Sequence, residues 1–162
     1  MNVLQLCVFT NHWGEGYEVE SWDLKNGRNV YDMDLYHGRN FDIICAAPPC
    51  DQFTRANCTR WDPYPSSYVE LARHCLLICL ASGRKWFLEN PPGRITTFLP
   101  ELIPYRAATW SGPYSNKEYV VYSNFLFLYS PVKRYGKSVI PRNKLLREEW
   151  LPEFVQALRS SL

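Results

Sequence analysis

The first half of the chain contains a strand, a proline-rich turn, a helix and a second strand in direct succession. Residues 41–47 are almost wholly apolar, which is typical of a strand covered on both faces. Apolar residues at helical spacing predict a helix that begins at Ser67, where Ser67 and Glu70 form a capping-box pattern, and ends at Gly83. Residues 85–88 form the next predicted strand. Because such a crossover joins parallel strands, this unit predicts an α/β fold with a parallel sheet.

Further strands are predicted before and after this unit. The other predicted elements are strands at 3–8, 18–22, 106–110, 118–122 and 125–129, a turn at 111–116, and a last helix that begins at Leu145 or Glu148 and ends at Leu158. The chain shows no repeat, linker or low-complexity tract. We therefore expect one α/β domain over residues 1–162.

Composition limits the classes of partner. With 162 residues, 46% of them hydrophobic, and a net charge of +2, the chain is neither disordered nor basic throughout, so nucleic-acid binding would need a local basic patch. The six cysteines include no Cys-x-x-Cys pair and the three histidines are scattered, so we expect no metal site and interpret the cysteines other than Cys50 as buried thiols. With no basic leader and no membrane-spanning apolar run, we expect a cytoplasmic location and no membrane contact.

Polar and reactive residue types follow three predicted strands at the point where each strand ends. Asp23 follows the strand at 18–22, Pro48, Pro49 and Cys50 follow the strand at 41–47, and Glu89 and Asn90 follow the strand at 85–88. In an open parallel sheet, the carboxyl ends of the strands form one edge, where ligands bind. The sequence therefore predicts a site at this edge.

Cys50 and Glu89 have chemistry that fits a single reaction. Two prolines stiffen the turn before Cys50, and the positive charges of Arg55 and Arg60 would favour its thiolate form. Glu89 follows an apolar strand, and partial burial would suit its carboxyl to donate a proton. A thiolate and a proton donor at neighbouring strand ends fit addition to an electron-poor double bond, such as carbon 6 of cytosine. The alternatives are an inert cysteine on a proline turn and an ordinary acid at a strand end.

Two segments resemble motifs of the DNA cytosine-5 methyltransferases. Residues 43–50, Ile-Ile-Cys-Ala-Ala-Pro-Pro-Cys, are similar to the nucleophile motif of that family, and residues 87–91, Phe-Leu-Glu-Asn-Pro, to its glutamate motif. The resemblance is closest to the short, phage-type members and covers roughly residues 19–125. It implies a Rossmann-like methyltransferase sheet, mostly parallel with a late antiparallel strand, and no target-recognition domain.

The resemblance also implies a mechanism. Cys50 would attack carbon 6 of a cytosine in DNA, Glu89 would protonate ring nitrogen 3, and carbon 5 would take the methyl group of S-adenosylmethionine. Asn90 and the two prolines would shape the loop under the base. The base would be flipped out of a duplex or taken from a strand that is already open.

Other roles are implied for charged residues. Asp23 matches the acid that binds ribose hydroxyls, and either Asp32 or Asp34 would contact the adenine amino group. Pro48 and Pro49 would also border the cofactor. Arg55, Arg60 and Lys117 are the candidate contacts to DNA, although a solvated lysine explains Lys117 equally well.

The segment after the first strand departs from the family pattern. Residues 9–16 have no glycine directly after the strand, where the family has Phe-x-Gly-x-Gly, and Asp51 stands where a glutamine is usual. This difference motivates a second interpretation, a catalytically inactive relative that binds nucleic acid or a protein partner. A third keeps the Cys50 chemistry with a free nucleotide as substrate.

Overall fold

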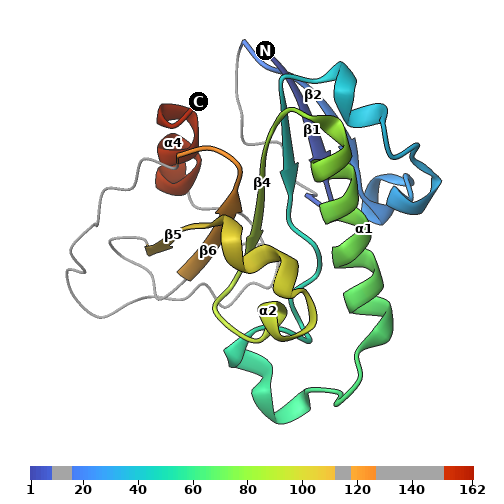
Figure 1. Cartoon of the computed structure of the whole chain (residues 1–162), viewed down its shortest axis with the longest axis vertical. Helices are drawn as coiled ribbons and strands as arrows, with labels where there is room; N and C mark the ends of the chain where they lie inside the picture. Colours follow the sequence, from blue (N-terminus) through green and yellow to red (C-terminus); the bar gives the residue numbers. More distant parts are fainter. Residues whose placement is uncertain (9–15, 112–117, 127–151) are drawn as a thin grey trace.

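The computed structural model describes residues 1–8, 16–111, 118–126 and 152–162 (Figure 1). The strands are β1 (Asn2–Leu6), β2 (Glu18–Trp22), β3 (Ile43–Ala46), β4 (Lys85–Asn90), β5 (Arg106–Ser111) and β6 (Glu118–Ser123). The α-helices are α1 (Ser66–Ser82), α2 (Ile95–Phe98) and α4 (Pro152–Ser160). Short 3-10 helices are η1 (Leu24–Asn26), η2 (Val30–Asp32), η3 (His37–Asn40), η4 (Arg55–Arg60) and η5 (Pro100–Tyr105).

The strands form one sheet of six in the order β2-β1-β3-β4-β6-β5. Strands β2, β1, β3 and β4 are parallel, and β6 runs antiparallel to both of its neighbours, β4 and β5. The fold is therefore α/β with a mostly parallel sheet and a late antiparallel strand, as predicted. In Figure 1 the arrowheads of β1, β3 and β4 point toward the end of the molecule where α2 lies.

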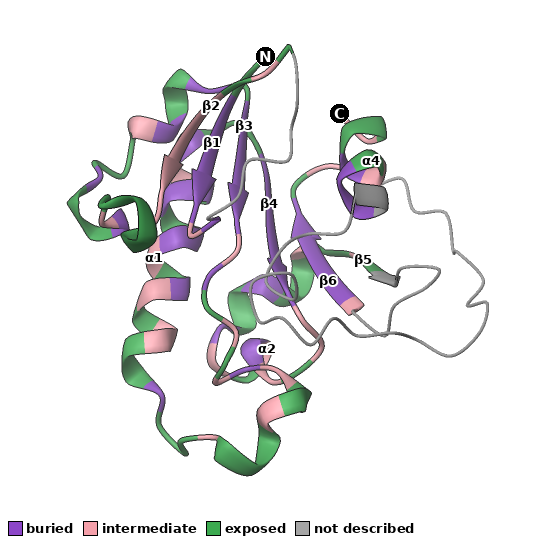
Figure 2. Ribbon diagram, turned by 180° about the vertical axis from the view of Figure 1, so that it is seen from behind, coloured by how far each residue is buried: buried purple, intermediate pink, exposed green. Residues whose placement is uncertain are grey.

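Helix α1 joins β3 to β4 and covers one face of the sheet (Figure 2). The buried residues of this face come from alternate strand positions and from one side of the helix; they include Leu4, Ile44, Trp86, Ala72, Leu76 and Cys79. The segments η2 and η3, which connect β2 to β3, lie against the same helix. The connections from β2 to β3 and from β3 to β4 run in the same direction along the sheet. Because right-handed connections are the rule, both lie on the same face.

Helix α4 packs on the opposite face. Its Phe154 ring stacks on Tyr119 of β6 with the ring centroids 4.2 Å apart and the planes 4° from parallel. Val155 and Leu158 complete the contact with buried residues of β1, β3 and β4. The sheet is thus covered on both faces, which explains why β3 is apolar throughout.

Several predicted boundaries are wrong. Helix α1 begins at Ser66 after Pro65, and no side chain caps it, because the Pro65 side chain cannot accept a hydrogen bond and Ser67 lies inside the first turn. The predicted stop at Gly83 is confirmed by its left-handed backbone, with φ of 65°. Strand β4 continues through Glu89 and Asn90 instead of ending at residue 88, since both residues pair with β6.

The late elements are tested only in part. Phe125 and Leu126 are not in a strand, so the predicted strand at 125–129 does not begin at Phe125, and its remaining residues lie outside the described ones. The region of the predicted turn beyond residue 111 also lies outside them, as does the predicted start of the last helix at Leu145 or Glu148. In the described part of the chain, no helix has the length and apolar character needed to cross a membrane.

Candidate active site

At one point in the sheet, the connections between consecutive strands run in opposite directions. From β1 the chain goes to β2 on one side, and the later strand β3 lies on the other side of β1. Ligands of open α/β sheets bind in the crevice that such a reversal opens at the carboxyl ends of the strands. Here these are the carboxyl ends of β1 and β3, and Cys50 lies four residues after the end of β3.

The carboxyl end of β1 has an uncommon backbone conformation. Cys7 has φ of 58°, and among the described residues it is the non-glycine residue with positive φ. Its N–H donates to the Trp22 carbonyl at 2.8 Å, so the turn is held against the end of β2. A residue with a side chain costs about 1 kcal/mol or more in this region, and such conformations occur often at functional sites.

The loop that carries Cys50 folds back on itself. We call residues 48–64 the Cys50 loop. The Cys50 carbonyl accepts hydrogen bonds from the N–H groups of Phe53 and Thr54, both at 2.8 Å. Asp62 N–H donates to Gln52 Oε1 at 2.7 Å, and the Trp61 indole N–H donates to the Thr54 carbonyl. The loop is therefore a compact unit rather than an open connection.

Residues after β4 bind this loop along its length. Asn90 Nδ2 donates to the Pro48 carbonyl at 3.1 Å, and Arg55 N–H donates to the Pro92 carbonyl at 3.1 Å. Thr54 and Gly93 form an antiparallel bridge. The loops after β3 and β4 thus lie side by side, which brings the chain segments of Cys50 and Glu89 to the same edge of neighbouring strands.

Gly93 allows the close approach of these two segments. A Cβ atom at this position would lie 1.7 Å from the Phe53 carbonyl oxygen and 3.1 Å from Thr54 Cα. Both neighbours are backbone atoms and cannot rotate away. Only glycine fits here without a shift of one loop relative to the other.

The side chain of Arg94, directly after Gly93, also binds the Cys50 loop. Its Nε donates to the Gln52 carbonyl at 2.9 Å, and its Nη2 donates to the Asp62 carbonyl at 2.5 Å. The guanidinium group lies over the Trp61 ring at 4.5 Å and over the Phe98 ring at 5.0 Å. A planar fork that binds two carbonyls and stacks on two rings is a role that lysine cannot reproduce.

The three predicted catalytic residues differ in exposure. Cys50 is half-buried, Glu89 is 6% exposed, and Asn90 is fully buried. Alternation along β4 places Glu89 on the face of Phe87 and Asn90 on the face of α1. The Asn90 Oδ1 atom is buried without a hydrogen-bond partner, which marks a polar position that the protein alone leaves unsatisfied.

The remaining cysteines are mostly poor nucleophiles. Burial raises the pKa of the Cys45 and Cys79 thiols, and the hydrogen bond to Cys7 together with burial raises the pKa of Cys75. The interpretation of these cysteines as buried thiols is wrong for Cys58, which is exposed in η4, and for Cys7, which is half-buried. The sequence alone does not show whether a cysteine in an irregular segment is exposed.

Two predicted cofactor residues lie at different places along the connection from β2 to β3. Asp23 directly follows β2 and caps η1, since its Oδ1 accepts from Lys25 N–H at 2.8 Å. Asp32 is exposed at the end of η2, a segment that lies against α1, and Asp34 is exposed and accepts from Tyr36 N–H. Only Asp23 adjoins the carboxyl edge of the sheet directly.

A small charged cluster adjoins Asp23. Glu20 accepts hydrogen bonds from the Trp22 indole N–H at 2.6 Å and from His37 Nε2 at 2.9 Å, and Arg28 lies 3.5 Å away. Burial opposes ionisation of Glu20, but the hydrogen bonds from Trp22 and His37 outweigh it and lower the pKa of this carboxyl. The carboxylate therefore stays charged and paired.

The predicted nucleic-acid contacts are tested in part. Arg55 and Arg60 are exposed at the two ends of η4, within the Cys50 loop. Lys117 lies outside the described residues. Among the described residues, no group of three or more histidine, cysteine or acidic side chains is arranged to hold a metal ion.

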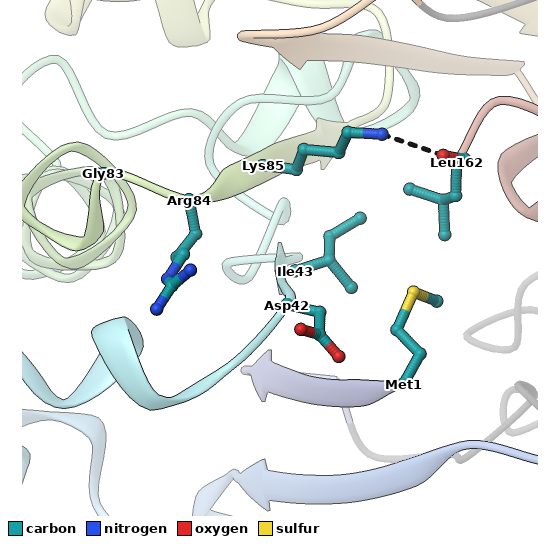
Figure 3. Close-up of a pocket in the computed structure, with 7 residues that line it drawn as sticks. All are labelled: Met1, Asp42, Ile43, Gly83, Arg84, Lys85 and Leu162. Carbon is teal, nitrogen blue, oxygen red and sulfur yellow. Dashed lines mark hydrogen bonds between the residues drawn. The ribbon is translucent and has the colours of Figure 1, made fainter.

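A separate pocket of about 360 Å³ lies at the opposite edge of the sheet (Figure 3). It is lined by Met1, Asp42, Ile43, Gly83, Arg84, Lys85 and Leu162, so it opens at the amino ends of β1, β3 and β4. Its polar side chains bind backbone groups: Asp42 accepts from Asn2 N–H, and Lys85 donates to the Leu162 carbonyl. None of the predicted site residues lines it.

Three residues of interest were not predicted from the sequence. Gln5 is 1% exposed in the middle of β1, and both polar atoms of its amide have no hydrogen-bond partner. The lone glutamine within the apolar segment 3–8 is the sequence signal for this buried polar residue. Gly93 and Arg94 have no such local signal, because their partners are about 40 residues away in the chain.

Comparisons with known proteins do not place the chain in a family. Neither the scan against known protein families nor the search of curated proteins gives a match.

Proposed function

We propose that the protein transfers a methyl group from S-adenosylmethionine to carbon 5 of cytosine in DNA, through a covalent adduct on Cys50. The observation that carries this proposal is the pairing of the loops after β3 and β4, with the bond from Asn90 to the Pro48 carbonyl and the bridge between Thr54 and Gly93. This pairing supports a single cleft shared by Cys50 and Glu89. The motif resemblance to the DNA cytosine-5 methyltransferases is the second support.

The reaction assigns one task to each of two side chains. The Cys50 thiolate attacks carbon 6 of the cytosine while the Glu89 carboxyl donates a proton to ring nitrogen 3, and carbon 5 becomes nucleophilic. S-adenosylmethionine, when bound, supplies the methyl group that carbon 5 takes. Solvent takes the carbon-5 proton, the electron pair of that C–H bond re-forms the C5–C6 double bond and expels the Cys50 thiolate, and ring nitrogen 3 returns its proton to Glu89. Asn90 acts as a positioning residue, since it holds the turn before Cys50.

The residues after β2 and β3 are compatible with a polar ligand. Asp23, at the end of β2, would bind the ribose hydroxyls, and Pro48 and Pro49 would border the ligand on the β3 side. Asp32 stays a prediction for the adenine contact.

A labelled methyl-transfer assay tests the proposal. We expect label in DNA with the wild-type chain, loss of at least a thousandfold in Cys50→Ser, and near wild-type activity in Cys58→Ser, which removes an exposed thiol from the same loop. DNA with 5-fluorocytosine should trap an adduct on Cys50, because fluorine at carbon 5 blocks the final elimination. Absence of label on both duplex and single-stranded DNA would refute methyl transfer.

A second candidate is an inactive relative that binds nucleic acid or a protein partner. The absence of the family's glycines directly after the first strand, in residues 9–16, favours it. Calorimetry separates the two: an inactive relative gives no saturable heat with S-adenosylmethionine, whereas the enzyme does. A Cys50 adduct with a fluorinated free nucleotide, and none with DNA, would instead support the third interpretation.

A further inference from the structure

The Cys50 loop presents an aromatic ring to solvent. Tyr64 is 84% exposed, and it stands between Pro63 and Pro65. Its N–H donates to Asp62 Oδ1 at 2.9 Å, and its carbonyl accepts from Ser66 N–H at 2.8 Å, directly before α1. The flanking prolines and these bonds fix the backbone, so the ring is held outward at a small entropic cost.

Two positive charges accompany this ring. Arg55 and Arg60 are exposed, and no hydrogen bond or ion pair of either guanidinium group is found within the described ranges. The nearby carboxylates are used inside the loop: Asp51 accepts from Asn57 Nδ2, and Asp62 accepts from Tyr64 N–H. The two guanidinium groups therefore face solvent.

The ring and the charges are held at the same edge as Cys50. Asp62 is bound to both Gln52 and Arg94, and Trp61 is bound to the Thr54 carbonyl. The end of the loop thus lies on its beginning, so Tyr64, two residues after Asp62, stays with the segment that carries Cys50. In Figure 1 this loop projects beyond the sheet beside α2.

We propose that Tyr64, Arg55 and Arg60 form a binding surface for unpaired DNA, with a base stacked on Tyr64 and the phosphates near the two arginines. The inference rests on the proposed function and names its substrate as a single strand or an open region. An exposed aromatic ring binds the face of a base, and that face is available only where bases are unpaired. Arginines at the ends of η4 supply the sequence-independent contact to phosphates.

Binding of fluorescent oligonucleotides, measured by anisotropy without cofactor, tests this surface. We expect the single strand to bind more tightly than a hairpin duplex of the same sequence or an RNA strand. Tyr64→Ala should weaken single-strand binding about 5- to 100-fold, Tyr64→Phe should keep it, and Arg60→Gln should reduce the salt dependence by about 0.7 in log–log slope. The control Tyr36→Ala removes a 56% exposed ring from the segment before η3, and it should bind as the wild type does.

The outcomes separate this inference from methyl transfer. Tighter binding of the duplex or of RNA, or wild-type binding by Tyr64→Ala, would overturn the inference even if Cys50 forms an adduct. Binding that depends on Tyr64, without methyl transfer on any DNA, would support the surface and refute the proposed reaction.

Discussion

The two edges of the sheet are built differently although both carry charged and polar residues. At the amino edge, a pocket of about 360 Å³ is lined by side chains whose polar groups already bind backbone groups. At the carboxyl edge, Asn90 Oδ1 is buried without a hydrogen-bond partner, and two loops are held together by long-range contacts. A hollow whose polar groups already have partners offers fewer polar contacts to a ligand than an edge where a reactive side chain and a second loop meet.

The largest expected difference between the edges comes from replacing a carboxyl by an amide. Glu89→Gln should lower the rate of methyl transfer by about 10²- to 10⁴-fold, because the proton donor to the base is lost. Asp42→Asn makes the same change at the amino edge and should leave the rate within twofold. Single-turnover methyl transfer measures both, and equal losses would contradict the assignment of Glu89.

Replacing a glycine tests how tightly each edge is packed. Gly93→Ala should destabilise the protein by about 1–3 kcal/mol and impair Cys50 adduct formation, because the new Cβ meets the Phe53 carbonyl oxygen at 1.7 Å. Gly83→Ala, at the end of α1, meets no atom within 4 Å and should cost only about 1 kcal/mol through its left-handed backbone. Urea unfolding and adduct yield are the measurements. An unimpaired adduct in Gly93→Ala would argue against the pairing of the two loops.

Arg84 provides a matched control for testing whether Arg94 positions the Cys50 loop. Arg94→Lys should raise the alkylation rate of Cys50 several-fold, since the loop loses a fork that binds two carbonyls and stacks on Trp61. Arg84 also donates twice to a carbonyl, that of Arg39, but at the amino edge, so Arg84→Lys should not change the rate. The alkylation rate of Cys50 is measured by mass spectrometry after iodoacetamide treatment in a Cys58→Ser background. If Arg94→Lys is alkylated as slowly as its parent, Arg94 does not position the loop.

The smallest effect is expected at the amino-edge pocket. Lys85→Met removes the bond from Lys85 Nζ to the Leu162 carbonyl, an exposed contact 2.8 Å long. Surface changes of this kind alter stability by less than about 0.5 kcal/mol, and methyl transfer should be unchanged. Thermal unfolding and the labelled assay check both values. A loss of activity here would show that the pocket contributes to function after all.

Much of the carboxyl edge was predictable from local sequence patterns. The apolar segment 41–47, the helix that stops at Gly83 and the strand that begins at Lys85 predict two parallel neighbours, and parallel neighbours end at the same edge. Strand ends were less predictable, because pairing with β6 extends β4 through Asn90 and this pairing joins residues 30 to 36 positions apart. The capping box at Ser67 failed because the helix already begins at Ser66, with Pro65 as its N-cap residue.

The linear order of residues was enough for the fold class, the parallel unit and the choice of Cys50 and Glu89 as candidates, since strand and helix periodicities act over two to four neighbours. The order of the strands, the burial of Gln5 and the contacts of Gly93 and Arg94 with the Cys50 loop followed only once the chain was folded. The contacts with the Cys50 loop join backbone segments about 40 residues apart in the chain. No local sequence pattern predicts that these segments come into contact.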